Sequence, residues 1–145
     1  MSETTDNGEV REETKQEIMA IQEAVHPSVL GMSIEDRIAN IHEHVLPQYK
    51  ANLFGNIYNF QDGIDAVRAG NMQAHTSIKH DLKFFSEGNT VICFGLADGA
   101  DYDKNGEKVS EHLNFPFCDV FVRVDGKLRI LAVTASAVPP ENPAK

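Results

Sequence analysis

The sequence of 145 residues has few basic residues and no long apolar run, and each absence excludes a class of protein. Lysine and arginine together number 13, against 22 aspartate and glutamate residues, so the formal net charge is −9 at pH 7. A folded domain this acidic repels phosphate backbones, and we expect no nucleic-acid partner. No stretch is long and apolar enough to cross a bilayer, so we expect no membrane partner either.

The chain also has little cysteine and no recognisable secretion signal. Cys93 and Cys118 both lie within apolar runs, which is typical of buried free thiols in a reducing compartment. The first residues are polar and acidic, without the basic start and apolar stretch of a signal peptide. These features predict a cytoplasmic protein. No glycine-rich phosphate loop is present, and we expect no cofactor.

Most of the chain is predicted to form one domain. Hydrophobic residues make up 41% of the sequence and charged residues 24%, which are typical values for a globular domain. Residues 1–9 are small, polar and without periodicity, and they are predicted to be disordered. Residues 139–145 are predicted to be a flexible tail. A single domain over residues 10–138 remains.

Helices are predicted in the first half of this domain. Apolar residues spaced by three and four along residues 12–25 predict one amphipathic helix. Ser33 is a suitable N-cap for a second helix, which is expected to end at Pro47. A short hairpin with a glycine–asparagine turn at residues 55–56 then leads into a third helix within residues 64–74.

Long strands are predicted in the second half. Residues 76–85 alternate in hydropathy, so that Ile78, His80, Leu82 and Phe84 are expected to share one apolar face. Further strands are predicted over residues 90–97, 109–124 and 127–138. Helices followed by a meander of strands predict an α+β fold, with N-terminal helices packed in a strongly curved, mostly antiparallel sheet.

Three segments carry a resemblance to a known family. They are FQDGIDAV (residues 60–67), TSIKHDLKFFSEGNTVICFGLADG (76–99) and FCDVFVRVDGKLRILAVTASAV (117–138). In this order they resemble the nuclear transport factor 2-like superfamily, the cystatin-like cone shared with ketosteroid isomerase and SnoaL-like polyketide cyclases. The resemblance covers residues 33–138 and implies an internal pocket in the cone. Many members carry a tryptophan after the closing turn, where this chain has Leu128 and no tryptophan anywhere.

Asp119 is the first candidate site residue. It interrupts an apolar run, and by alternation it shares a face with Phe115, Phe117 and Phe121, if an irregularity at Pro116 does not shift the register. An apolar wall raises the pKa of a carboxyl group. The resemblance places Asp119 where ketosteroid isomerases keep a protonated aspartate as a hydrogen-bond donor. The alternative is a structural carboxylate held by a backbone or arginine partner.

His80 is the second candidate catalytic residue. It lies on the predicted apolar face of its strand, where a histidine with a shifted pKa can act as an acid or a base. The alternative is a histidine at the edge of the core with one satisfied hydrogen bond. The predicted lining of the pocket is aromatic and comprises Tyr49, Phe54, Tyr58, Phe60, Phe115, Phe117 and Phe121.

No metal site is predicted. His42 and His44 lie near the end of a predicted helix, where their spacing separates the two rings, and zinc needs three or four converging ligands. The segment DYDKNG at residues 101–106 opens like a calcium-binding loop. Lys108 and His112 stand where that loop needs an apolar residue and a glutamate, so a hairpin turn between two strands is predicted instead.

Two functions from different classes follow. The first is a SnoaL-like domain that binds a small apolar compound in the conical pocket, with or without acid–base catalysis of isomerisation, cyclisation or hydrolysis. Ketosteroid isomerase itself is not expected, because no carboxylate lies at residues 53–55, where the resemblance implies its base. The second is a non-catalytic homodimeric ligand-binding or interaction module. Its predicted contact surface comprises alternating residues of the last two strands, Val120, Val122, Val124, Leu131 and Val133.

Overall fold

One curved sheet wraps around the first helix in the computed structural model, which describes residues 2–137. The helices of this part of the chain are α1 (Glu12–Val25), α2 (Ile34–His44) and α3 (Phe60–Arg68). Its strands are β1 (Val45–Leu53), β2 (Asn56–Asn59), β3 (His75–Glu87), β4 (Thr90–Tyr102), β5 (Lys108–Val124) and β6 (Lys127–Ala135). The predicted α+β class is confirmed. None of the described helices has the length and apolarity needed to cross a membrane.

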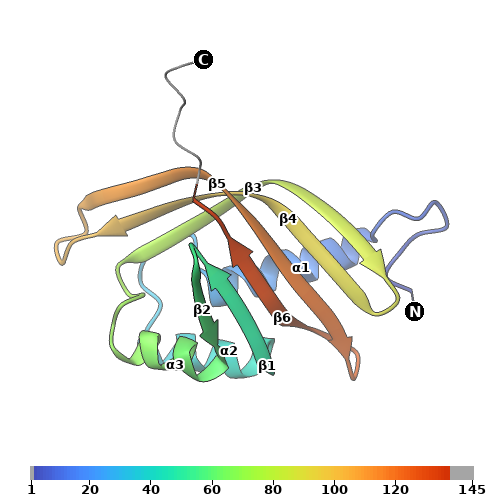
Figure 1. Cartoon of the computed structure of the whole chain (residues 1–145), viewed down its shortest axis with the longest axis horizontal. Coiled ribbons are helices and arrows are strands. Elements are labelled where there is room, and N and C mark those ends of the chain that lie inside the picture. The colour runs from blue at the N-terminus through green and yellow to red at the C-terminus, as the bar shows by residue number, and fades with distance from the viewer. Residues whose placement is uncertain (1, 138–145) are drawn as a thin grey trace, which may run out of the picture.

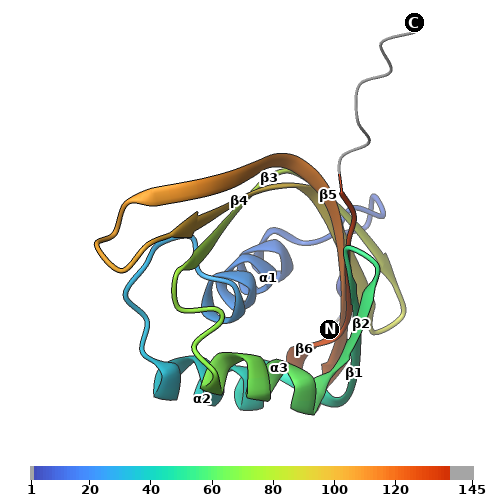
Figure 2. The ribbon, with the colours of Figure 1, turned by 60° about the vertical axis from the view of Figure 1, so that its left-hand side comes forward.

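The strand order in the sheet is β2-β1-β6-β5-β4-β3. Neighbouring strands are antiparallel except β1 and β6, which are parallel. The long strands β3, β4 and β5 arch over α1 (Figure 1), while α2 and α3 lie across the open side below it (Figure 2). The core lies between α1 and the concave face, where Ile18, Phe121 and Ile130 are at most 1% exposed. Burial of each such side chain contributes about 2 kcal/mol.

Helices α2 and α3 begin where capping side chains accept hydrogen bonds from their first amide groups. α1 has the predicted bounds, and the Ser33 hydroxyl accepts from the Asp36 amide at 3.1 Å at the start of α2. The predicted end of α2 at Pro47 is wrong, because the chain already pairs with β6 at Val45. The third helix also starts earlier than predicted, since Asn59 and Asp62 form a capping box at 2.8 and 2.9 Å.

The first hairpin turns at Phe54 and Gly55, one residue before the predicted position. Both residues have positive φ, 54° and 92°, which is the geometry of a tight two-residue hairpin turn. The turn brings the aromatic side chain of Phe54 to the concave side, where its ring meets the Phe115 ring edge-on at 5.4 Å between centroids. The hairpin thus supplies one wall of the space inside the cone.

A β-bulge interrupts β3 at Asp81. This residue has a φ of 54°, and the pairing of β3 with β4 changes register between His80 and Lys83. Gly95 lies opposite the bulge on β4. A Cβ atom at Gly95 would lie 2.7 Å from the His80 carbonyl oxygen and 2.9 Å from that of Asp81. The bulge therefore requires a glycine on the neighbouring strand.

The bulge reverses the alternation predicted for β3. Before it, Lys79 lines the concave side and His80 lies on the outer face; after it, Leu82 and Phe84 pack against the core. The prediction that His80 shares one apolar face with Leu82 and Phe84 is therefore wrong. The physical reason is that one extra residue in a strand shifts every later side chain to the opposite face.

The segment before α1 is held against the sheet. Glu3 is 4% exposed, accepts from the Thr14 hydroxyl at 3.0 Å, and forms an ion pair with Arg123 of β5. Arg123 also contacts Glu17 of α1 at 2.9 Å, so one guanidinium joins three segments. The hydrogen bond that Arg123 donates to Glu3 holds the pKa of the Glu3 carboxyl group below the usual value of 4.5. The prediction that residues 1–9 are disordered therefore differs from the structure at Glu3, while residues 139–145 lie outside the described residues.

Candidate functional site

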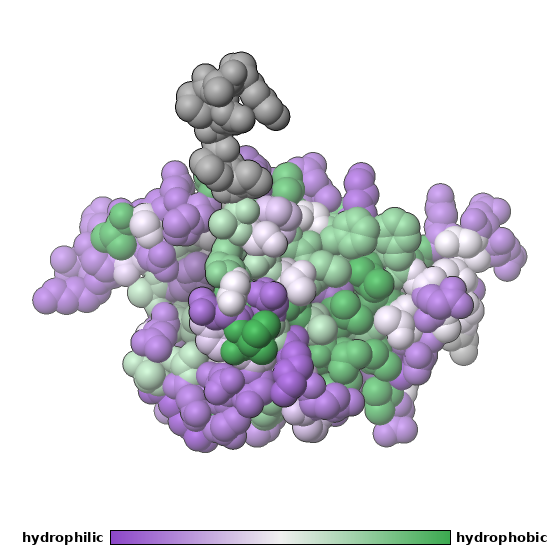
Figure 3. All heavy atoms as spheres, viewed as in Figure 1, coloured by the Kyte–Doolittle hydropathy of each residue, from purple (hydrophilic) through white to green (hydrophobic). Residues whose placement is uncertain are grey.

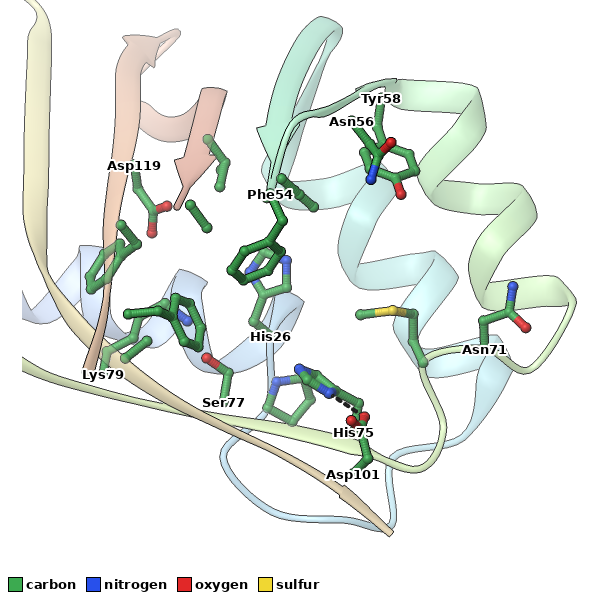
Figure 4. A pocket seen from close by; sticks show the side chains of 18 of the residues that line it. His26, Phe54, Asn56, Tyr58, Asn71, His75, Ser77, Lys79, Asp101 and Asp119 are labelled. Atoms are coloured by element: carbon green, nitrogen blue, oxygen red, sulfur yellow. Dashed lines mark hydrogen bonds and ion pairs between the residues drawn. The ribbon is translucent and has the colours of Figure 1, made fainter. Parts of the chain in front are cut away.

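A cavity of about 360 Å³ opens between the concave face of the sheet and the helices (Figure 4). This volume lies within the range of small-molecule sites in proteins. A second cavity of about 280 Å³ adjoins it, and His26, Arg37, Leu53, Tyr58, Asn71 and Met72 line both spaces. We call the larger space the main cavity.

The structure brings together most of the aromatic residues that were predicted to line a pocket. Phe54, Tyr58, Phe115 and Phe117 line the main cavity. Tyr49 and Phe60, together with Tyr58, line the adjoining one. Phe121 is 0% exposed and lies in the core, so it lines neither cavity.

Asp119 lies at one end of the main cavity and is 2% exposed. Its Oδ2 accepts from the Gln22 side-chain amide of α1 at 2.9 Å, and Oδ1 takes no part in that contact. Burial raises the pKa of this carboxyl group, although the Lys79 charge and the Gln22 hydrogen bond act in the opposite direction. The result is a carboxyl group with one oxygen anchored and a strengthened tendency to hold a proton.

The predicted orientation of Asp119 is confirmed, since Phe115, Phe117 and Phe121 lie on the same inward face of β5. The expected irregularity at Pro116 does not occur there. The register with β4 shifts earlier, between Phe115 and His112, where Asn114 has a positive φ. Asp119 therefore keeps simple alternation with the aromatic residues.

Lys79 enters the same cavity because of the β3 bulge. Its Nζ lies 5.7 Å from the centroid of the Phe117 ring, and burial lowers the pKa of its ammonium group. The sequence analysis missed this residue, because regular alternation places it on the polar outer face. Gly95 was the signal in the sequence that could have indicated the bulge. An isolated glycine inside an apolar strand is typical of a bulge or of the close approach of another backbone segment.

His26 is a third ionisable residue of the cavity that the sequence analysis missed. It follows directly after α1, and its backbone amide donates to the Gln22 carbonyl at 2.7 Å. Burial, with the positive charges of Lys79 and Arg37 nearby, lowers the pKa of His26 to about 3. The imidazole is therefore neutral near pH 7. Figure 4 shows its ring in the middle of the view, with Asp119 and Lys79 on one side.

A histidine–carboxylate pair lies in another part of the cavity wall. His75 Nδ1 contacts Asp101 Oδ1 at 2.8 Å (Figure 4), and the Ser110 hydroxyl donates to Asp101 Oδ2 at 2.8 Å. The His75 contact is the main reason why the pKa of Asp101 is lowered. The segment at residues 101–106 is a hairpin turn as predicted, in which Asp103 Oδ1 accepts from two backbone amides.

His80 lies outside the cavity. Its ring contacts Asp81 at 2.8 Å and Asp98 at 3.2 Å, and these two hydrogen bonds raise its pKa. It does not line the cavity that holds Asp119. The two predicted catalytic residues are therefore not brought together.

The cysteines are free thiols in the structure. Burial raises the pKa of Cys93 to about 12 and also raises that of Cys118, which leaves both as unreactive thiols. Within residues 2–137, no group of three histidine, cysteine or carboxylate side chains has a geometry that could hold a metal ion.

Comparisons by sequence found no family model and no curated protein that matches this chain. Comparison of structures found many similar folds. One is a protein of unknown function from Prochlorococcus sp. NATL2A, described as nuclear transport factor 2-like, with a TM-score of 0.65, 18% identity, and coverage of 88% of this chain and 95% of that one.

Two further structures extend the likeness. A nuclear transport factor 2-like protein from Salmonella enterica has a TM-score of 0.69 at 13% identity, covering 90% of this chain and 95% of that one. A putative calcium/calmodulin-dependent protein kinase II association domain from Xanthomonas campestris has a TM-score of 0.67 at 14% identity, covering 96% and 98%. At such identities the likeness establishes the fold alone. The chain has the cone-shaped α+β fold of the nuclear transport factor 2-like superfamily.

Proposed function

We propose that this chain binds a small organic molecule with an apolar body in the main cavity, and that Asp119 and His26 act on it as acid and base. The observation that carries this proposal is the opposite perturbation of two groups facing one apolar cavity. Burial raises the pKa of Asp119 and lowers that of His26. Such a pair brings a carboxyl group with a strengthened tendency to hold a proton and an unprotonated imidazole to one cavity.

The chemistry that fits this pair is proton transfer next to a carbonyl group. A His26 ring nitrogen takes a proton from the carbon beside the carbonyl, and the electron pair of that C–H bond forms the double bond of an enol. Asp119 Oδ1 donates a proton to the carbonyl oxygen, while Gln22 holds Oδ2 in place. Isomerisation and cyclisation both begin with this step, and the apolar wall excludes competing water.

The pH dependence of binding tests the role of Asp119. We expect the affinity for 1-tetralone, an aromatic ketone, to fall as the pH rises through the raised pKa of Asp119, because a protonated carboxyl donates to the ketone and a carboxylate does not. Since burial places the folded pKa of Asp119 above its usual 3.8, the donor is present below that raised value and lost above it. Isothermal titration calorimetry measures the change.

Asp119→Asn is the matched control, because it keeps a neutral donor and leaves every other titrating group of the cavity in place. Its affinity for 1-tetralone should not vary with pH. Asp119→Leu should lower the affinity about tenfold below the raised pKa of Asp119, which corresponds to one lost hydrogen bond, and its affinity should not vary with pH. A wild-type affinity that is independent of pH, or an unchanged affinity in Asp119→Leu, would contradict the role of Asp119.

A second function, assembly as a homodimer through the outer face of the sheet, is favoured by one observation. Phe85 and Phe94 stack at 5.1 Å on this face and are 55% and 39% exposed. Figure 3 shows apolar side chains gathered over β4, β5 and β6. Val120 and Val122 are half-buried there. Val133 was predicted to lie on the same surface, but it is buried and lines the main cavity. The reason is an extra residue in β6 near Leu131, which shifts the pairing of β6 with β5.

We expect Phe94→Lys to raise the dissociation constant of such a dimer at least about tenfold, because a charge at the centre of an apolar contact is costly to bury. Sedimentation velocity at increasing protein concentration measures the constant. Val29→Lys is the control, since Val29 is an exposed apolar residue in the loop after α1. A wild-type chain that stays monomeric at every concentration would contradict the dimer proposal.

A further inference from the structure

Two cationic side chains of the main cavity form no ion pair with a carboxylate within residues 2–137. Lys79 Nζ has no carboxylate oxygen within 4.0 Å among residues 2–137. Arg37, from α2, is 5% exposed, and its guanidinium donates only to the carbonyl oxygens of Val25 and Met72, at 3.2 and 3.3 Å. Its Nε is buried without a partner in the described part of the chain. Two positive charges are thus held in the wall of a mostly apolar space.

The carboxyl groups of the cavity do not neutralise these charges. Asp101 is already paired with His75, and Asp119, although its charge acts on Lys79, forms no ion pair with it within 4.0 Å. Burial also raises the pKa of Asp119. Desolvating an unpaired cation carries a large cost, which lowers the pKa of both Lys79 and Arg37. The whole chain has a net charge of −9, so positive charges gathered in its cavity are not a consequence of composition. A negatively charged ligand group would remove this cost.

We propose that the ligand of this cavity is a small amphipathic carboxylate, whose charged group is bound by Lys79 and Arg37 and whose apolar or aromatic body fills the rest of the space. This inference rests on the proposed function and adds the chemical class of the ligand. The cavity lining matches both halves of such a molecule. Phe54, Phe115 and Phe117 supply the apolar wall, and the two cations supply the polar end.

His26, a third polar residue of the cavity, also supports a carboxylate as the ligand group. His26 lines the same cavity as Lys79 and Arg37, and both positive charges contribute to the lowering of its pKa. A neutral imidazole also donates a hydrogen bond to a carboxylate. The polar end of the cavity therefore offers a ligand carboxylate two cations and one neutral donor, and charge-assisted hydrogen bonds of this kind are the stronger ones.

The test compares 3-phenylpropionate with its uncharged isostere 3-phenylpropionamide by isothermal titration calorimetry. We expect the wild-type chain to bind the carboxylate about tenfold more tightly than the amide, which corresponds to one charge-assisted hydrogen bond. Lys79→Met removes the charge but keeps the length of the side chain. It should abolish most of the preference for the carboxylate over the amide.

Lys83→Met is the matched control on the same strand, because Lys83 is exposed on the outer face and should affect neither affinity. Equal affinity of the wild type for the carboxylate and the amide would overturn the carboxylate inference and leave the proposed binding function standing. Binding of neither compound would count against both. A preference that persists in Lys79→Met would overturn the role of Lys79, and Arg37→Met then tests whether the second cation alone accounts for it.

Discussion

Replacing Gly95 with alanine is expected to lower the free energy of unfolding by about 3 kcal/mol. The added methyl group would lie 2.7 Å from the backbone oxygen of His80, and a backbone atom cannot move aside as a flexible side chain can. Gly95 does not have a positive φ, so alanine is compatible with its backbone conformation. The decrease in the free energy of unfolding therefore measures the steric contact between the added methyl group and the backbone of the bulge. Urea denaturation followed by circular dichroism gives the difference.

Gly63→Ala is the control for this substitution. Gly63 lies within α3 with open space around its Cα, and alanine there should stabilise the chain by about 0.5 to 1 kcal/mol. A Gly95→Ala variant as stable as the wild type would show that β3 and β4 do not meet as closely as the bulge requires. The inward position of Lys79 would then lose its structural basis.

If the proposed proton transfer takes place, replacing His26 with glutamine is expected to slow the protein-dependent exchange of deuterium into the carbon beside the carbonyl of 1-tetralone by about 100-fold. Glutamine fills similar space and keeps a hydrogen-bonding group, but its amide lacks the basic ring nitrogen that would take the proton from carbon. Proton NMR in deuterated buffer follows the loss of the signal from this carbon. The rate should be compared with that in buffer alone.

His80→Gln is the decisive companion variant. His80 was the catalytic histidine predicted from the sequence, whereas the structure places it on the outer face with Asp81 and Asp98. We expect its exchange rate to equal that of the wild type. A slow His80→Gln variant beside an unaffected His26→Gln variant would reverse the assignment, and a wild-type rate equal to buffer alone would contradict the catalytic part of the proposal.

Local sequence patterns predicted several parts of this molecule correctly. The bounds of α1, the Ser33 cap and the hairpin turn at residues 101–106 each depend on residues that are near in sequence. The orientation of Asp119 was predictable for the same reason, because β5 alternates regularly from Phe115 to Phe121. Where periodicity is unbroken, a sequence determines which face a side chain occupies.

The composition of the candidate site was decided by tertiary structure. Lys79 faces the cavity and His80 does not, because an extra residue at Asp81 is accommodated by Gly95 on another strand. His26 and Arg37 come from a helix end and a second helix, and no spacing in the sequence relates them to Asp119. The sequence by itself determined the order of the elements and the face of each regular strand. The bulge and the packing of separate segments decided which charges share one apolar cavity, because such contacts depend on residues far apart in the chain.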